Sequence, residues 1–131
     1  MSQPIIPFLT FCGTAEAAVN FYVSIFPSSK INHMTMVGKN ERGEEGKVFH
    51  SSFELKGQPL MAMDMEAAYC PAFTWAISLY MECPVESEFD HLFDKLSAEG
   101  NVLMGPEPVG NLRKVAWVSD KFGVTWKLFL K

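Results

Sequence analysis

The sequence contains no long uninterrupted apolar run. Pro, Gly or a charged residue breaks every such run well before the roughly 20 residues that a membrane-spanning helix requires. The first four residues, Met1–Pro4, also lack the basic segment and apolar core of a signal peptide. The sequence therefore predicts a cytoplasmic protein without a membrane partner.

Cysteine is scarce and shows no pattern. The chain has three cysteines, Cys12, Cys70 and Cys83, at wide spacings that fit neither a disulfide framework nor a CxxC metal clip. We therefore expect thiols that behave as small apolar side chains. Basic residues do not cluster either, and the net charge is -4. A nucleic-acid partner is excluded on this criterion, because such proteins carry a basic patch or stripe.

Apolar residues, by contrast, are plentiful, at 48% of 131 residues, enough for the core of one compact domain. In the first half, the apolar segment 5–11 predicts a strand that stops at a turn containing Gly13. Thr14 is a suitable N-cap for an amphipathic helix that Pro27 ends. Strands are then predicted over 30–37, 47–55 and 59–64, with a charged loop at 38–46.

The same order of elements is predicted again after a connection at 65–71. A strand over 75–83 precedes a helix over 84–100, and strands follow over 101–104, 114–119 and 124–130, with a loop at 105–111. We predict an α+β fold, a single domain over 1–131 made of two tandem βαβββ modules, 1–66 and 72–131. The helices would lie outside curved mixed sheets, whose uncovered concave faces would form a cavity for a ligand.

Five parts of the chain resemble one known family. One part, 116–126, reads AWVSDKFGVTW, and another, 53–62, reads FELKGQPLMA. The other parts are Gly13–Tyr22, Ile25–Ser29, and Ala76–Leu79 with Phe93–Leu96. Together they resemble the PhnB-like branch of the vicinal oxygen chelate superfamily, which includes glyoxalases, bleomycin resistance proteins and dioxygenases. This branch often carries a demethylubiquinone methyltransferase-like label. The chain lacks the Gly-rich strand–turn–helix that typically holds S-adenosylmethionine, so we expect no such cofactor.

The resemblance implies four positions at which catalytic superfamily members hold a divalent metal with His and Glu. Neither carboxylate nor imidazole occurs at any of them, and at one the chain has an ammonium group. We therefore expect no metal cofactor. The transferred positions are Pro7, one residue among Met61, Ala62 and Met63, one near Trp75, and Lys127.

Other residues are candidates for ligand contact. His50, Ser52 and Glu54 alternate with Phe49 and Phe53, so they share one face of a strand, either facing the cavity or simply solvated. Lys127 would meet a carboxylate or phosphonate if it faces the cavity, and solvent if the register slips by one residue. Methionine and tryptophan side chains would line such a cavity or fill the core. The ligand-contact candidates are His50, Ser52, Glu54, Met61, Met63, Trp75, Trp117 and Lys127.

Three functions follow from these observations. The first is a metal-free homodimer, with modules exchanged or not, that binds a small organic molecule. The second is an enzyme of the lyase, isomerase or dioxygenase type, with a non-standard metal or acid–base site built on His50, Glu54 and Asp64. His33 is a further possible metal ligand. The third is a purely structural or interaction module. The residues alone identify neither the ligand nor a reaction.

Overall fold

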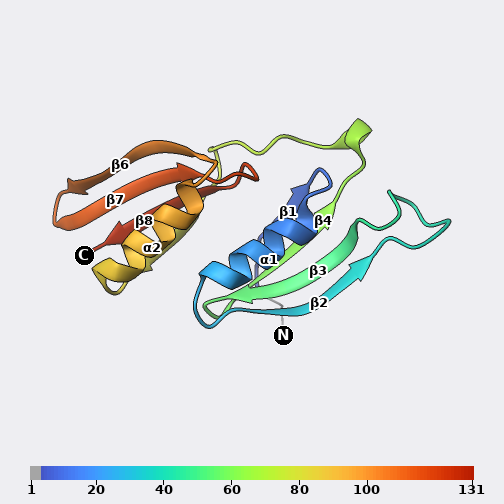
Figure 1. Ribbon diagram of the computed structural model, residues 1–131, viewed down its shortest axis with the longest axis horizontal. Coiled ribbons are helices and arrows are strands. Elements are labelled where there is room, and N and C mark those ends of the chain that lie inside the picture. The colour runs from blue at the N-terminus through green and yellow to red at the C-terminus, as the bar shows by residue number, and fades with distance from the viewer. Residues whose placement is uncertain (1–3) are drawn as a thin grey trace. The chain divides into compact units, whose positions relative to one another are not determined.

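The computed structural model describes residues 4–131 and divides them into two compact units, the first ending at Pro71 and the second running from Ala72 to Lys131. Each unit is a four-stranded sheet with one α-helix packed on it (Figure 1). Within the described residues, no helix is long and apolar enough to cross a membrane.

The first unit has the predicted βαβββ order. Its strands are arranged β1-β4-β3-β2, with β1 parallel to β4 and the other pairs antiparallel. A short 3-10 helix, η1, follows the last strand. The elements are β1 (Phe8–Phe11), α1 (Ala15–Ile25), β2 (Lys30–Met36), β3 (Val48–Leu55), β4 (Gln58–Asp64) and η1 (Ala67–Tyr69).

The second unit repeats this topology. Its strand order is β5-β8-β7-β6, again with one parallel pair, β5 with β8. The predicted α+β class with two βαβββ modules is therefore confirmed. The elements are β5 (Leu79–Cys83), α2 (Glu86–Ser97), β6 (Asn101–Val109), β7 (Leu112–Ser119) and β8 (Thr125–Leu130).

The largest differences from the predicted strand boundaries are in β1, β5 and β6. β1 begins at Phe8, and β5 begins only at Leu79 because Trp75 lies in a turn. β6 continues to Val109 through the predicted loop, although it contains Gly105 and Pro106. β6 is an edge strand with register shifts on both sides of this dipeptide, so a missing backbone N–H is tolerated there. Gly105 has a φ of 78°, and a Cβ would meet the carbonyl oxygen of Val115.

The core of each unit lies between its helix and its sheet. Apolar residues recur at helical spacing on α1 and α2, and alternate residues of the central strands face them. The fully buried side chains include Val19, Tyr22, Phe11 and Phe53 in the first unit, and Phe89, Leu92, Leu96, Val118 and Leu128 in the second.

One aspartate in each unit fixes a turn by accepting three hydrogen bonds. The Asp64 carboxylate accepts from the backbone N–H groups of Gly13, Ala15 and Val48, at 2.8–2.9 Å. It thereby joins the end of β4 to the start of α1 and to β3. The Asp120 carboxylate accepts from the backbone N–H groups of the turn that follows β7 and from an indole on β8. Its donors are Phe122 N, Val124 N and Trp126 Nε1.

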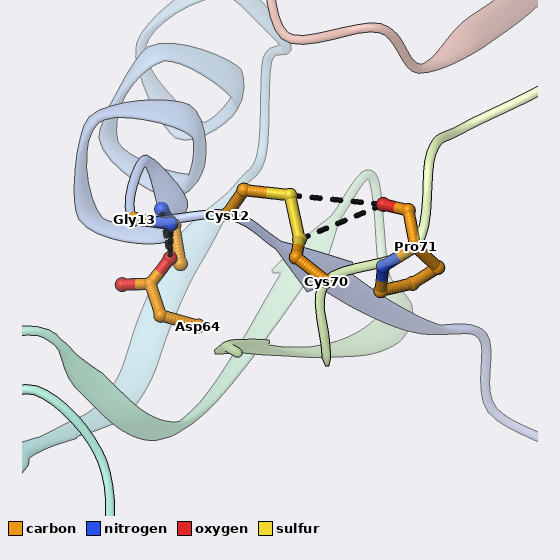
Figure 2. The surroundings of a disulfide bond; sticks show 6 residues. Cys12, Gly13, Asp64, Cys70 and Pro71 are labelled. Atoms are coloured by element: carbon orange, nitrogen blue, oxygen red, sulfur yellow. Dashed lines mark hydrogen bonds between the residues drawn. A yellow bond between two sulfur atoms is a disulfide. The ribbon is translucent and has the colours of Figure 1, made fainter. Parts of the chain in front are cut away.

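A disulfide bond joins Cys12, directly after β1, to Cys70, directly after η1 (Figure 2). Their Cα atoms lie 5.7 Å apart, and both sulfurs lie near the carbonyl oxygen of Pro71. The expectation of small apolar thiols is therefore wrong for this pair. Cys83 is buried and lies outside this disulfide, as expected. The bond ties the segment that leaves the first unit back to the turn before α1.

We predict that Asp120→Ala lowers the free energy of unfolding by about 3 kcal/mol, because Asp120 is only 3% exposed and three donors would lose their acceptor. Chemical denaturation followed by circular dichroism measures this change. Asp94→Ala, on the exposed side of α2, is the matched control and should change stability by less than about 0.5 kcal/mol. Equal losses in the two variants would contradict a stabilising role for Asp120.

We also predict that purified protein, denatured without reductant, exposes one reactive thiol, Cys83, and that reductant raises the number to three. Because the bond spans 58 residues, reduction should lower stability by about 4 kcal/mol in the chain-entropy estimate. Mass spectrometry after alkylation counts the thiols, and denaturation with and without reductant measures the loss. The double variant with Cys12→Ala and Cys70→Ala should not respond to reductant. Three reactive thiols in protein that was purified in air without reductant would refute the bond.

Candidate functional site

Each sheet has one face covered by its helix and one face that is free of it, which we call the open face. In β3, the covered face holds buried Ser51, Phe53 and Leu55. The alternate residues therefore point to the open face of the first sheet. Phe49 departs from the expected packing under α1, since it is 53% exposed near a register shift between β2 and β3.

Strand register brings five of the predicted contact residues together on the open face of the first sheet. Ser52 lies opposite Met61 on β4, and Met61 lies opposite Phe8 on β1. On the other side, Ser52 pairs with His33 of β2. The set consists of His50, Ser52, Glu54, Met61 and Met63, which alternate with the buried residues of β3 and β4.

The most specific contact on this face is a pair of imidazoles. His33 Nε2 and His50 Nδ1 lie 2.8 Å apart, which is hydrogen-bonding distance, and the two rings are stacked. One ring must donate and the other accept, so at least one imidazole is neutral in this arrangement. The Phe8 ring lies 5.8 Å from the His50 ring. Sequence reasoning named His33 only as a possible metal ligand, because the strand register that joins it to His50 was unknown.

The residues proposed for an alternative metal or acid–base site do not form one cluster. Glu54 faces Lys30, with Oε2 3.9 Å from Nζ. Both Asp64 oxygens already accept backbone N–H groups. Within residues 4–131, no group of three or more His, Cys, Asp or Glu side chains is placed to hold a metal ion. Of the proposed set, only His33 and His50 are in contact.

The open face of the second sheet holds the other predicted residues, except one. Trp117 on β7 lies directly opposite Lys127 on β8, and Lys127 lies opposite Tyr80 on β5. The Lys127 ammonium sits over the Trp117 ring, 4.3 Å from its centroid. Trp75 is the exception, because it lies in a turn before β5 and is 66% exposed.

Tyr80 forms a small polar and aromatic group beside Lys127. Its hydroxyl donates to Glu82 Oε2 at 3.1 Å, and its ring meets the Phe129 ring edge-on. Desolvation, together with the hydrogen bond and negative charge of Glu82, raises the pKa of the Tyr80 phenol. The phenol therefore stays protonated at neutral pH.

The four positions that the superfamily uses for a divalent metal do not suit one here. Proline offers no side-chain donor at position 7, and Met61 and Met63 offer thioethers, which are soft ligands. Lys127 presents an ammonium, which repels a cation. The side chains at these positions therefore do not fit the metal that the fold implies.

The fold defines the class of protein. The structure superimposes on a glyoxalase, bleomycin resistance protein or dioxygenase domain from Frankia with a TM-score of 0.68 at 14% identity, covering 99% of this chain and 92% of that one. It superimposes on a protein from Pseudomonas aeruginosa with a TM-score of 0.83 at 24% identity, covering 99% of this chain and 98% of that one. The chain thus has the fold of the vicinal oxygen chelate superfamily.

The family follows from closer matches. A solved structure described as a PhnB protein from Bacillus cereus and, provisionally, as a 3-demethylubiquinone-9 3-methyltransferase has a TM-score of 0.93 at 41% identity, with 98% of this chain and 100% of that one covered. The family model described as 3-demethylubiquinone-9 3-methyltransferase matches residues 3–129. The chain belongs to this family, the PhnB-like branch of the superfamily. No curated protein matches it.

The methyltransferase description implies S-adenosylmethionine, and the chain does not offer the usual place for it. That cofactor typically binds at a Gly-rich turn between a strand and the N-terminus of a helix. Here the turn before α1 has a single glycine, and its Gly13 and Ala15 N–H groups are taken by Asp64. The turn before α2, at Pro84 and Val85, has no glycine. Neither turn fits the cofactor.

Proposed function

We propose that this protein binds a small organic molecule on the open faces of its sheets, without a metal at the superfamily positions. The observation that carries the proposal is the open face of the first sheet. There the His33–His50 pair lies beside Phe8, in strands whose open-face residues include Met61 and Met63. Small-molecule sites typically combine such apolar and aromatic surface with a few polar groups that fix orientation.

The methionines suit this role physically. Thioethers are polarizable and flexible, so they adapt to apolar or planar ligands of different shape. Met61 and Met63 are half-buried, whereas the alternate residues Leu60 and Ala62 fill the core. The folded sheet therefore keeps these two side chains partly accessible instead of using them for packing.

An acid–base enzyme is the second candidate, and the contact between His33 and His50 favours it. Two imidazoles at 2.8 Å can exchange a proton, which is what general acid–base catalysis requires. The two candidates differ in what His50 does. In a binding protein its loss weakens affinity, and in an enzyme its loss abolishes turnover while the ligand still binds. A structural module, the third class, would bind no small molecule.

We predict that native mass spectrometry, or titration with neutral and charged aromatic compounds, reveals a bound ligand, and that His50→Ala weakens binding roughly three- to tenfold. This is the effect expected for the loss of one hydrogen bond. His91→Ala is the control, because His91 is exposed on α2, and it should bind as the unsubstituted protein does. Absence of binding by every compound, with no co-purified molecule, would refute the proposal and favour a structural module.

Assembly into a homodimer is part of the proposal. Open sheet faces with exposed aromatic side chains such as Phe8 and Tyr80 are unfavourable in water and suit a second copy of the chain. An exchange of modules between chains would use the connection after β4. The Cys12–Cys70 bond restricts such an exchange, since it holds η1 to the first unit. We therefore place the hinge after Pro71, later than the 65–71 connection alone suggests.

We predict a solution mass of twice 14.7 kDa by light scattering. If modules exchange, reduction of the Cys12–Cys70 bond should speed subunit exchange between differently labelled dimers, because the connection gains freedom. The Cys12→Ala and Cys70→Ala double variant should show the fast rate without reductant. A species of 14.7 kDa at micromolar concentration would contradict the dimer.

A cytoplasmic location also belongs to the proposal. Disulfides are rare in that compartment, where thiols are kept reduced. A cytoplasmic copy would therefore hold Cys12 and Cys70 mainly as two thiols, with the bond forming under oxidising conditions.

A further inference from the structure

The open face of the second sheet carries two hydrogen-bond donors that lack an acidic partner. They are the Lys127 ammonium and the Trp117 indole N–H, from residues directly opposite each other on β8 and β7. This register puts both side chains on the same face, so their positions relative to each other are set by the sheet itself.

Lys127 is held over an aromatic ring and not by a carboxylate. Its Nζ lies 4.3 Å from the centroid of the Trp117 ring, and within the described part of the chain no carboxylate lies within 4.0 Å of it. Three other lysines of this unit do have such partners: Lys114 meets Glu86 and Asp90, Lys121 meets Glu99, and Lys131 meets Glu82. A ring face attracts a cation but leaves all three N–H donors of the ammonium free to bind another group.

The Trp117 indole N–H is the second donor. Nε1 is buried, and residues 4–131 provide no acceptor for it. Trp126, on the neighbouring strand of the same β-hairpin, makes the contrast clear, since its Nε1 donates to Asp120 at 2.8 Å. A buried N–H without an acceptor is unfavourable, and native proteins supply one from a side chain, water or ligand.

Both donors therefore favour a group that only accepts hydrogen bonds and is negatively charged. The indole N–H and the ammonium have no acceptor capacity, so a neutral hydroxyl or amide would use only part of its own hydrogen-bonding groups here. Glu82, which the register places on this face opposite Phe129, is already engaged by the Tyr80 hydroxyl and by Lys131. It does not compete for Lys127.

The surroundings indicate the rest of the ligand. Tyr80 lies on one side of Lys127 and Met104 lies beside Trp117, and the Tyr80 ring packs against Phe129. These side chains offer aromatic and thioether surface to a planar or apolar body. Resting on the proposed binding function, we propose that the Trp117–Lys127 pair binds the oxyanion group, such as a carboxylate or phosphonate, of an aromatic or apolar small molecule.

The test compares 2-naphthoate with 2-naphthamide, which share a ring system and differ in charge. Binding is followed by calorimetry and by the indole N–H resonances of the three tryptophans, assigned with Trp117→Phe. We expect the anion to bind at least about tenfold more tightly than the amide, because hydrogen bonds to charged groups are the stronger ones. The Trp117 indole resonance should shift on binding, and those of Trp75 and Trp126 should move less.

Two variants separate the donors. Lys127→Met keeps the length of the side chain and removes the charge, and should abolish the preference for the anion. Trp117→Phe keeps a ring under Lys127 and removes the N–H. It should weaken binding of the anion several-fold and have less effect on binding of the amide. Lys95→Met, exposed on α2, is the control and should bind both compounds as the unsubstituted protein does. Circular dichroism checks that all variants fold.

The outcomes distinguish this inference from the function on which it rests. Equal affinity for naphthoate and naphthamide, unchanged by Lys127→Met, would overturn the oxyanion site and leave small-molecule binding intact. If neither compound binds and no neutral aromatic compound binds, both the oxyanion site and the proposed binding function are overturned. A tenfold preference that survives Lys127→Met would place the anion elsewhere and would also overturn the inference.

Discussion

Every functional feature of this protein depends on the two-residue period of its strands, with one helix on one face of each sheet. Each helix buries one set of alternate residues, such as Ser51 and Phe53 of β3, and leaves the set between them on the open face. A register slip of one residue would turn Lys127 toward α2 and remove it from Trp117. Stability and the proposed binding therefore use the same strands but opposite faces, so a change on one face need not disturb the other.

The covered faces are held in register by long-range polar contacts as well as by apolar packing. Asp64 joins β4 to the start of α1 and to β3, and Asp120 joins β7 to β8. This explains the most recognisable part of the sequence, 116–126, in structural terms. Its Asp120 and Trp126 are partners in one buried hydrogen bond, so these two residues of the motif reflect the fold of the family and say little about its chemistry.

The sequence predicted the architecture well because both halves repeat one pattern of periodicities. It predicted that His50, Ser52 and Glu54 share one face of a strand, since alternation along a strand needs no tertiary information. Met61 and Met63 were expected there because of their polarizable side chains. It missed β6 beyond residue 104, because Gly105 and Pro106 are typical of loops and only their place on an edge strand permits them. It also placed Trp75 in a strand, although Trp75 and Ala76 form a turn and the strand begins only at Leu79.

What the sequence could not predict are the contacts between segments far apart in the chain. Cys12 and Cys70 are separated by 58 residues, and no spacing rule pairs them. His33 and His50 meet only because β2 and β3 pair with a register shift between Ile31 and His33. Neither shift nor pairing is visible in the residue types, so His33 was considered without its partner.

Trp117 and Trp126 show how the same residue type serves both faces. They lie on neighbouring strands of one hairpin, and the register places Trp126 opposite Val118, one residue beyond Trp117. This one-residue offset puts the two indoles on opposite faces. On the covered side, the fold supplies Trp126 with the Asp120 carboxylate. On the open side, among the described residues, Trp117 receives an ammonium over its ring and no acceptor for its N–H. The sheet satisfies one indole with its own carboxylate and leaves the other beside a cation. Its open face therefore has the donors for an anion that comes from outside the chain.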